Sequence, residues 1–355
     1  MPAGQATGPA AGQASGAKDD AGAVSDPGLP GVTILGGYLG AGKTTLLNHL
    51  LRHADGRRIA VLVNDFGDIG IDAALIEART EDLLELAGGC VCCSFGSDLV
   101  GALRAIARRR PRPDHVVIET SGVALPAPVA QAVGLVPGLR VDATVVLCDA
   151  QTVRLRMADR YVGETVAAQL AQADLIVLNK LDLVPTDARP ELQAWLAQRH
   201  PGVEVVAAVQ AAAPVELVLG WPDPVLDRDA AVRRRSTARG SVFTDRAGSW
   251  RNRHAAPGAG AFVSASFPIA HPVDVRQLAQ GLAAPHLGLL RAKGVMRDQD
   301  GSSVVLQLVG SRIEIGDRAP AAAGLEAGTL VCIGLRGRFA GAAIGRIVDE
   351  AMRPA

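Results

Sequence analysis

Three of the chain's five cysteines lie close together, at Cys90, Cys92 and Cys93 in the segment GGCVCC. Thiolates are preferred ligands of Zn²⁺ and of other soft or borderline transition metals. The two glycines allow the sharp turn that brings neighbouring thiolates toward one ion, although the short spacing can keep all three from binding together. Asp68, a water molecule or a group of a partner protein would complete the coordination. The sequence predicts a transition-metal site at this turn.

Two other uses of these thiols are open from the sequence alone. The cysteines could form a redox-active cluster, or they could be buried as small hydrophobic side chains. Burial is the expectation for Cys148 and Cys332, because both lie in apolar strand patterns. The chain has no histidine-rich tract, so bulk metal storage is not expected.

A second stretch fits a phosphate-binding loop. The segment GYLGAGKT, from Gly37 to Thr44, matches the pattern G-x-x-x-x-G-K-[ST] between an apolar run and a helical pattern. Glycines let backbone amides surround the phosphates, and the helix N-terminus that follows adds positive potential. Lys43 would span the β- and γ-phosphates, and Thr44 would hold Mg²⁺. The residues expected to contact the nucleotide here are Gly37, Gly40, Ala41, Gly42, Lys43, Thr44 and Thr45.

The segment IVLNKLDL indicates which base the nucleotide carries. It puts Asn179, Lys180 and Asp182 at the carboxyl end of an expected strand, where open α/β sheets bind ligands. An aspartate can accept hydrogen bonds from both N1–H and the 2-amino group of guanine, whereas adenine has no such pair of donors on that edge. A polar strand-to-helix turn is the alternative interpretation. Together with the phosphate-binding loop, these residues predict GTP.

Three places along the chain offer a carboxylate that would hold Mg²⁺ or orient the attacking water. Glu119 ends one expected strand, Asp149 ends another, and Asp65 is the first of three acids in the segment VNDFGDIGID. The sequence alone does not rank them. Gly122 follows Glu119 closely and would expose its amide to the γ-phosphate, which favours that strand as the γ-phosphate sensor. We predict catalytic roles for Lys43, Glu119 and Asp65.

The elements that must position these residues follow from the apolar pattern. Between residues 31 and 220, continuous apolar runs alternate with helical patterns, as expected for strands covered on both faces of a parallel sheet. The expected strands cover residues 32–37, 58–64, 115–120, 142–149, 174–180 and 203–208. The expected helices include residues 44–53, 97–109 and 189–199. This order predicts an α/β fold with a doubly wound, mainly parallel sheet.

Three further regions flank this expected P-loop domain. Residues 1–30, rich in Ala, Gly and Pro, are expected to form a disordered tail. Residues 221–260 have little periodicity, several Gly and Pro, and many arginines. The arginines with Trp250 could form a basic nucleic-acid contact, but a solvated linker is the favoured interpretation. Residues 261–350 carry several short strand patterns and one helical pattern, which predict a small C-terminal α+β domain.

Composition narrows the classes of protein. Lys and Arg together number 36, as do Asp and Glu, so no net charge attracts nucleic acid or a membrane surface. No run of about 18 apolar residues predicts a membrane span, and the N-terminus lacks the apolar core of a secretory signal. The cysteine spacing does not fit an extracellular disulfide framework. A cytoplasmic location is therefore expected, with neither nucleic acid nor membrane as a partner.

Five segments in this order, GGYLGAGKTTLLNHLL, VNDFGDIGID, GGCVCC, ETSG and NKLD, resemble the CobW-like family of GTPases, relatives of the urease and hydrogenase nickel-insertion GTPases. The resemblance covers about residues 31–345, since LLRAKGVM is similar to the family's C-terminal domain. It implies that the three clustered cysteines are the metal motif and that Glu119 belongs to the second nucleotide motif. It also suggests Asp68 as an acid near the metal, where members commonly have Glu. Two departures are Val63, at a position that is acidic in some relatives with an extra metal site, and the missing His-rich loop.

The resemblance implies a GTP-hydrolysing chaperone that carries a transition metal, most often Zn²⁺, to a client metalloprotein. Co²⁺, Ni²⁺ and Fe²⁺ remain open as the cargo, as in a cobalt or nickel insertion GTPase, and a homodimer is possible. A second hypothesis is a GTP-controlled regulatory switch in which the cysteines are structural. An ATP-dependent kinase or ligase is disfavoured by Asp182.

Overall fold

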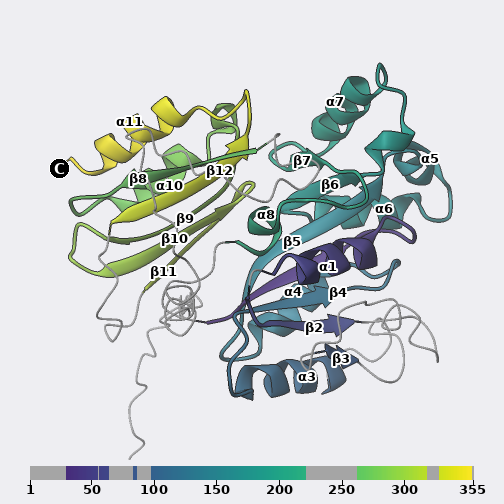
Figure 1. Ribbon diagram of the computed structural model, residues 1–355, viewed down its shortest axis with the longest axis horizontal. Helices are drawn as coiled ribbons and strands as arrows, with labels where there is room; N and C mark the ends of the chain where they lie inside the picture. Colours follow the sequence, from purple (N-terminus) through teal and green to yellow (C-terminus); the bar gives the residue numbers. More distant parts are fainter. Residues whose placement is uncertain are drawn as a thin grey trace, which may run out of the picture.

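The structure, a computed structural model, describes residues 29–54, 56–63, 83–85, 97–220, 262–317 and 328–353. It contains two β-sheets, each packed against helices, that lie side by side (Figure 1). Residues 1–28 of the expected tail at 1–30, and the whole expected linker at residues 221–260, lie outside the described residues. In the described part of the chain, no helix is both long enough and apolar enough to cross a bilayer.

The first sheet is parallel and has seven strands in the order β3-β2-β4-β1-β5-β6-β7. The chain builds outward from β1 on both sides, which is the doubly wound arrangement. Continuous apolar runs form its central strands, because both faces of the sheet are covered. The strands are β1 (Gly31–Gly36), β2 (Ile59–Val63), β3 (Leu83–Glu85), β4 (His115–Glu119), β5 (Arg140–Asp149), β6 (Leu175–Asn179) and β7 (Glu204–Ala207). The predicted α/β fold with a doubly wound parallel sheet is confirmed.

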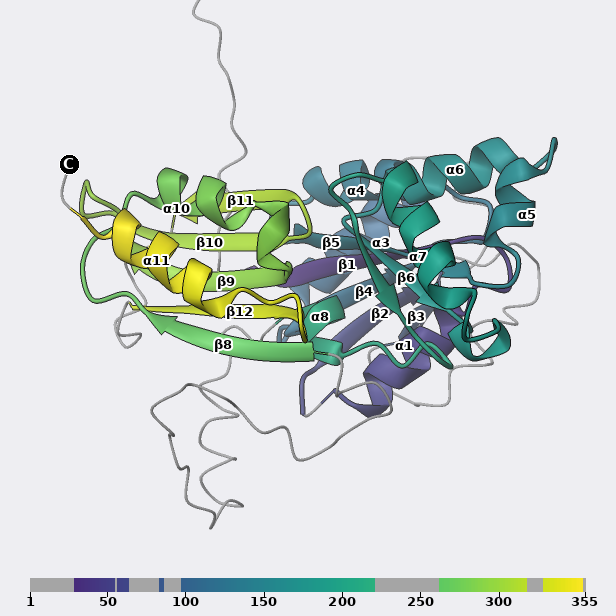
Figure 2. The same cartoon turned by 90° about the horizontal axis from the view of Figure 1, so that it is seen from above.

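Consecutive residues of β1 show how the two faces are filled. Leu35 packs in one core cluster with the buried leucines of α1, while Ile34 packs in another with α3 and α4. Figure 2 shows α1 on one side of the sheet and α4 and α6 on the other. The helices of the first face are α1 (Lys43–Arg52) and α8 (Val215–Leu219). Those of the second are α3 (Ser97–Arg108), α4 (Pro126–Gly134), α5 (Val153–Ala158), α6 (Gly163–Ala171) and α7 (Arg189–Arg199).

One strand of this sheet, β3, was not expected from the sequence. It has three residues, paired in parallel with β2. A run this short falls below the four to eight residues, roughly, that give a recognisable strand pattern. Its pairing extends the sheet by one strand beyond β2, on the side away from β5.

The second sheet is antiparallel, with five strands in the order β11-β10-β9-β12-β8. Two helices, α10 (Val275–Leu282) and α11 (Gly341–Ala351), pack on one face, where they share a core with Leu330 and Cys332. The strands are β8 (Phe262–Pro268), β9 (Leu289–Arg297), β10 (Ser303–Val309), β11 (Arg312–Asp317) and β12 (Thr329–Leu335). This is the α+β arrangement that the C-terminal sequence predicts.

A buried ion network joins the two sheets. Arg291 of β9 donates hydrogen bonds to the Leu217 carbonyl oxygen at 3.0 Å and to Asp142 of β5. Arg140 donates to Asp142 Oδ1 at 3.2 Å and to Gln307 Oε1 of β10 at 2.8 Å. Burial opposes ionisation of Asp142, but Arg291 and Arg140 outweigh this effect and hold its pKa below the usual range. The second sheet therefore contacts the amino ends of the parallel strands, away from the edge where β1 leads into α1.

Candidate nucleotide site

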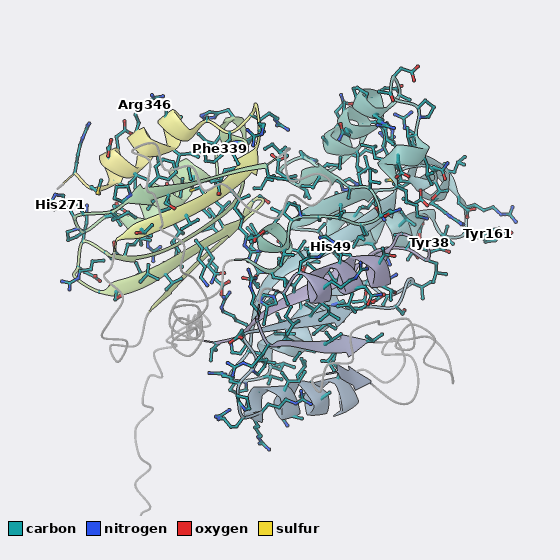
Figure 3. All side chains as sticks on the ribbon, in the orientation of Figure 1. Tyr38, His49, Tyr161, His271, Phe339 and Arg346 are labelled. Carbon is teal, nitrogen blue, oxygen red and sulfur yellow. The ribbon has the colours of Figure 1, made fainter. Side chains whose placement is uncertain are left out.

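The glycine-rich loop between β1 and α1 has backbone angles that require glycine. Gly37, Gly40 and Gly42 have φ angles of 130°, 77° and 103°, which L side chains rarely adopt. A Cβ at Gly37 would also lie 2.2 Å from the Leu147 carbonyl oxygen of β5. The loop can therefore hold its backbone close to a ligand at the carboxyl edge of the sheet. Figure 3 shows its Tyr38 at the far end of the molecule from His271.

The Lys43 ammonium lies inside this loop. Its Nζ donates a hydrogen bond to the Gly37 carbonyl oxygen at 3.0 Å, and the residue is only 8% exposed. Lys43 is also the first residue of α1, whose unpaired N–H groups and dipole favour an anion. Thr45, which follows in α1, is exposed. A buried cation and a helix N-terminus beside a partly exposed glycine-rich loop are features that favour the binding of a phosphate chain.

Thr44 and Glu119 meet beside Lys43. Thr44 Oγ1 donates a hydrogen bond to Glu119 Oε1 at 2.9 Å, and Glu119 is 2% exposed at the end of β4. The strand register explains the contact, because β4 pairs with β1 so that Glu119 lies opposite Leu35, next to the start of the loop. A hydroxyl and a carboxylate oxygen, both hard ligands, are thus brought together from positions far apart in the sequence.

Gly122 lies directly against the glycine-rich loop. A Cβ at this position would be 2.4 Å from Leu39 Cδ2 and 2.9 Å from the Leu39 backbone nitrogen. Only glycine fits without displacement of the loop backbone. The turn that follows Glu119 is therefore in contact with the loop, as a sensor of the terminal phosphate requires.

Asn179 connects the glycine-rich loop to the segment that follows β7. Its Nδ2 donates to the Ala41 carbonyl oxygen at 2.9 Å, and its Oδ1 accepts a hydrogen bond from the Ala211 N–H at 2.8 Å. A Cβ at Gly42 would lie 2.4 Å from Asn179 Nδ2, so glycine is required there for this contact as well. The side chain is 2% exposed. Asn179 therefore has a structural link to the loop rather than a free amide.

Lys180 and Asp149 form a pair at the ends of neighbouring strands. Lys180 Nζ lies 2.8 Å from Asp149 Oδ2, and Asp149 Oδ1 accepts a hydrogen bond from the Gln151 N–H at 2.9 Å. Asp149 is thus engaged beside β6, while Glu119 is the acid in contact with Thr44. Asp182 lies in the short helix Leu181–Leu183 and is exposed, where a base can reach its carboxylate.

The conformation of the segment after β7 was not expected from the sequence. Gln210 and Ala211 have φ angles of 50° and 54°, unusual for residues other than glycine. The Ala211 N–H pairs with Asn179, which lies 32 positions earlier in the chain. The alanine-rich sequence carries no signal of this conformation, because a distant side chain holds it.

The predicted metal residues Cys90, Cys92, Cys93 and Asp68, and the predicted catalytic Asp65, lie outside the described residues. Among the residues that the structure does describe, no group of three His, Cys, Asp or Glu side chains is placed to hold a metal ion. Cys148 and Cys332 are buried, as predicted, at 5% and 0% exposure. Burial raises the pKa of both thiols.

Comparison with known proteins gives two family matches along the chain. Residues 31–207 match the CobW/HypB/UreG nucleotide-binding domain, and residues 262–351 match the cobalamin synthesis protein cobW C-terminal domain. The chain is 33% identical over 340 residues to a zinc chaperone CobW of a Sinorhizobium species, covering 85% of this chain and 92% of the relative. It is 38% identical over 167 residues to the zinc-regulated GTPase metalloprotein activator 1 of Schizosaccharomyces pombe, covering 44% and 40% of the two chains. The solved structure of Zn(II)-bound YjiA GTPase from E. coli aligns with 92% of this chain and 99% of its own, at 21% identity and a TM-score of 0.39.

Proposed function

The chain belongs to the CobW/HypB/UreG family of P-loop GTPases, and on this premise we propose that it binds Zn²⁺ and uses GTP hydrolysis to deliver this ion to a client metalloprotein. The choice of zinc is supported by relatives that are named zinc chaperones, in Sinorhizobium and in Pseudomonas aeruginosa. The observation that carries the nucleotide half of the proposal is the contact between Thr44 and Glu119 beside the buried Lys43 ammonium.

The pair of oxygens at this contact fits Mg²⁺. The ion takes six oxygen ligands in an octahedron at about 2.0–2.1 Å, so adjacent ligands are about 2.9 Å apart. Thr44 Oγ1 and Glu119 Oε1 are separated by 2.9 Å. These two residues would hold the ion, and the ion would neutralise charge that develops on the β- and γ-phosphates.

Charge stabilisation by the chain itself falls to the glycine-rich loop. Lys43 would turn its ammonium from the Gly37 carbonyl toward the phosphates, where it stabilises the developing negative charge. The Gly122 amide, held against the loop at Leu39, would bind the γ-phosphate. Asp65 remains our candidate for orienting the attacking water.

Asp182 is proposed as the residue that selects guanine. Its exposed carboxylate can accept from N1–H and from the 2-amino group of the base. Asn179 ties the neighbouring backbone to the loop, and Lys180 is fixed by Asp149. The base and the phosphates are thereby held by one connected edge of the sheet.

For the transported ion we propose Cys90, Cys92 and Cys93 as ligands, with Asp68 nearby. The cysteines follow β3 in the chain, and Asp68 follows β2. Both strands run parallel to β4, so their carboxyl ends lie at the same edge as Glu119. Movement at this edge that depends on the bound nucleotide would couple the GTP site to the metal site. GTP and the metal would then change each other's affinity by the same factor.

A double substitution tests the ion site. Cys92→Ser/Cys93→Ser keeps side-chain size but removes thiolates, so we expect loss of tight binding of one Zn²⁺ per chain in competition with a chromogenic chelator. Cys332→Ala is the control, because this thiol is buried in the second sheet and its loss leaves the proposed ligands intact. Unchanged zinc affinity in the double variant would leave the regulatory switch as the better function.

A further inference from the structure

Gln169 of α6 reaches across to the turn that follows Glu119. Its Nε2 donates hydrogen bonds to the Gly122 carbonyl oxygen at 3.1 Å and to the Ala124 carbonyl oxygen at 2.9 Å. The side chain is 1% exposed, so water does not compete for these contacts. Both neighbours are acceptors, which fixes the amide with its NH₂ group toward the turn.

Gln169 also lies near the glycine-rich loop. Gln169 lines a small cavity together with Tyr38 and Leu39 of the loop and Thr152 beside α5. Its Oε1 is buried and makes no hydrogen bond within the described part of the chain. A buried acceptor without a hydrogen bond lowers the stability of the fold. The two hydrogen bonds that the same amide donates to the turn explain why a glutamine is nevertheless accommodated here.

The turn that Gln169 holds is in tight contact with the loop. Gly122 lies so close to Leu39 that a Cβ would meet the Leu39 backbone nitrogen at 2.9 Å. Displacement of the turn therefore changes its distance from the loop that binds the phosphates. No residue of α6 matches any of the nucleotide motifs, and the hydrogen bonds of Gln169 that lead toward the site go to this turn.

We propose that Gln169 is a positioning residue for the terminal phosphate: it holds the turn so that the Gly122 amide lies at the correct distance from the γ-phosphate of GTP. The inference rests on the proposed role of Gly122. GDP lacks the γ-phosphate, so Gln169 should affect the binding of GTP and the rate of its hydrolysis but not the affinity for GDP. A displacement of about 1 Å at a reacting centre can cost roughly a hundredfold in rate.

A neighbouring glutamine provides a matched control. Gln172, at the end of α6, accepts a hydrogen bond from the Ala127 N–H at 2.8 Å, where α4 begins. It joins α6 to the same segment of chain, but its hydrogen bond is to Ala127 and not to Gly122 or Ala124. Loss of this contact removes one structural hydrogen bond without releasing the turn.

The experiment compares Gln169→Met with Gln172→Met, since methionine has a similar length but no donor or acceptor of comparable strength. For Gln169→Met we expect kcat to fall at least tenfold and the affinity for a slowly hydrolysed GTP analogue to fall, with GDP affinity within twofold of wild type. For Gln172→Met we expect both affinities and kcat within twofold. Equal losses for GDP and the analogue, or no change in either, would overturn the proposal.

A second measurement on the unmodified protein avoids dependence on the folding of a variant. Hydrogen–deuterium exchange of α6 should be slower with the GTP analogue than with GDP, because a γ-phosphate on Gly122 tightens the turn against Gln169. Equal exchange of α6 with both nucleotides would contradict the inference. Absence of GTP hydrolysis by the wild-type protein would instead overturn the proposed function itself, so the two failures are distinguishable.

Discussion

His115 provides a stability prediction with a calculable size. It begins β4 and is 5% exposed, and its Nε2 lies 2.8 Å from Thr33 Oγ1. The Thr33 hydroxyl donates to the Val218 carbonyl oxygen, so neutral His115 donates its Nε2–H to Thr33. The pKa of His115 is lowered to about 3, chiefly by burial; the negative charge of Asp142 opposes this shift, and the positive charges of Arg291 and Arg57 add to it.

The sign of the effect follows from these pKa values. Above pH 6.5 the histidine is neutral in both the folded and the unfolded chain, and its contribution to stability is fully present. As pH falls from 6.5 toward about 3, only the unfolded chain takes up the proton, so the folded state loses stability. One pKa unit corresponds to about 1.4 kcal/mol, so the loss at pH 5 is about 2 kcal/mol from this residue alone.

The assay is urea unfolding of wild type and His115→Gln at pH 7.5 and at pH 5. Glutamine has no titratable group but can still donate to Thr33. We expect the variant to be the less stable protein at pH 7.5, and its loss of unfolding free energy on acidification to be smaller than that of wild type by about 2 kcal/mol. Other titrating groups contribute to both proteins and cancel in the difference. The same loss in both proteins would refute the account of His115.

Three further predictions concern the nucleotide site. Lys43→Ala should lower the rate of phosphate release at saturating GTP by at least about a hundredfold, because the loop loses its buried ammonium; an unchanged rate would show that the loop binds another anion. Asp182→Asn should weaken GTP binding by about 2 kcal/mol or more, since a charged acceptor of two guanine donors is lost. Equal affinity of the unmodified protein for GTP and ATP in a competition titration would sink that assignment. Glu119→Gln should raise the Mg²⁺ concentration for half-maximal hydrolysis by at least about tenfold, and an unshifted Mg²⁺ titration would assign the ion to another carboxylate.

The fold of the first sheet was predictable because its strands are long apolar runs between clear helical patterns. Strands such as GVTILG in β1 are buried on both faces, and a continuous apolar run in the sequence indicates such burial. The short β3 and the helix α11 were not named from the sequence. β3 has three residues, and its pairing with β2 depends on a neighbour rather than on its own pattern.

The candidate site was predictable where a motif is continuous in sequence, and less so where partners are distant. From the sequence alone, Glu119, Asp149 and Asp65 were unranked candidates for the Mg²⁺ and water roles, although Gly122 favoured the strand of Glu119 as the γ-phosphate sensor. Strand order separates the first two: β4 brings Glu119 to Thr44, while Asp149 on β5 faces Lys180 at the end of β6. Gln169 was missed for the same reason, since its contacts with the turn depend on how α6 packs.

The contact between the two sheets was also beyond the sequence. Asp142 and Arg291 are 149 positions apart in the chain. Each is a charged residue within an expected strand, and nothing in the sequence indicates that the two are paired. Their pairing is visible only once both sheets are placed. A buried ion pair of this kind is costly to break, because removal of one partner leaves the other charge buried and uncompensated.

Control of a bound metal by the nucleotide state is tested most directly by the zinc affinity of the unmodified chain with GDP and with a slowly hydrolysed GTP analogue. The measurement is competition for Zn²⁺ with a chromogenic chelator, with Mg²⁺ present throughout. We expect the two affinities to differ by about tenfold or more, the range of coupling between linked sites. Equal zinc affinity with both nucleotides would contradict the account, because a chaperone whose metal site does not respond to GTP cannot use hydrolysis to release its cargo.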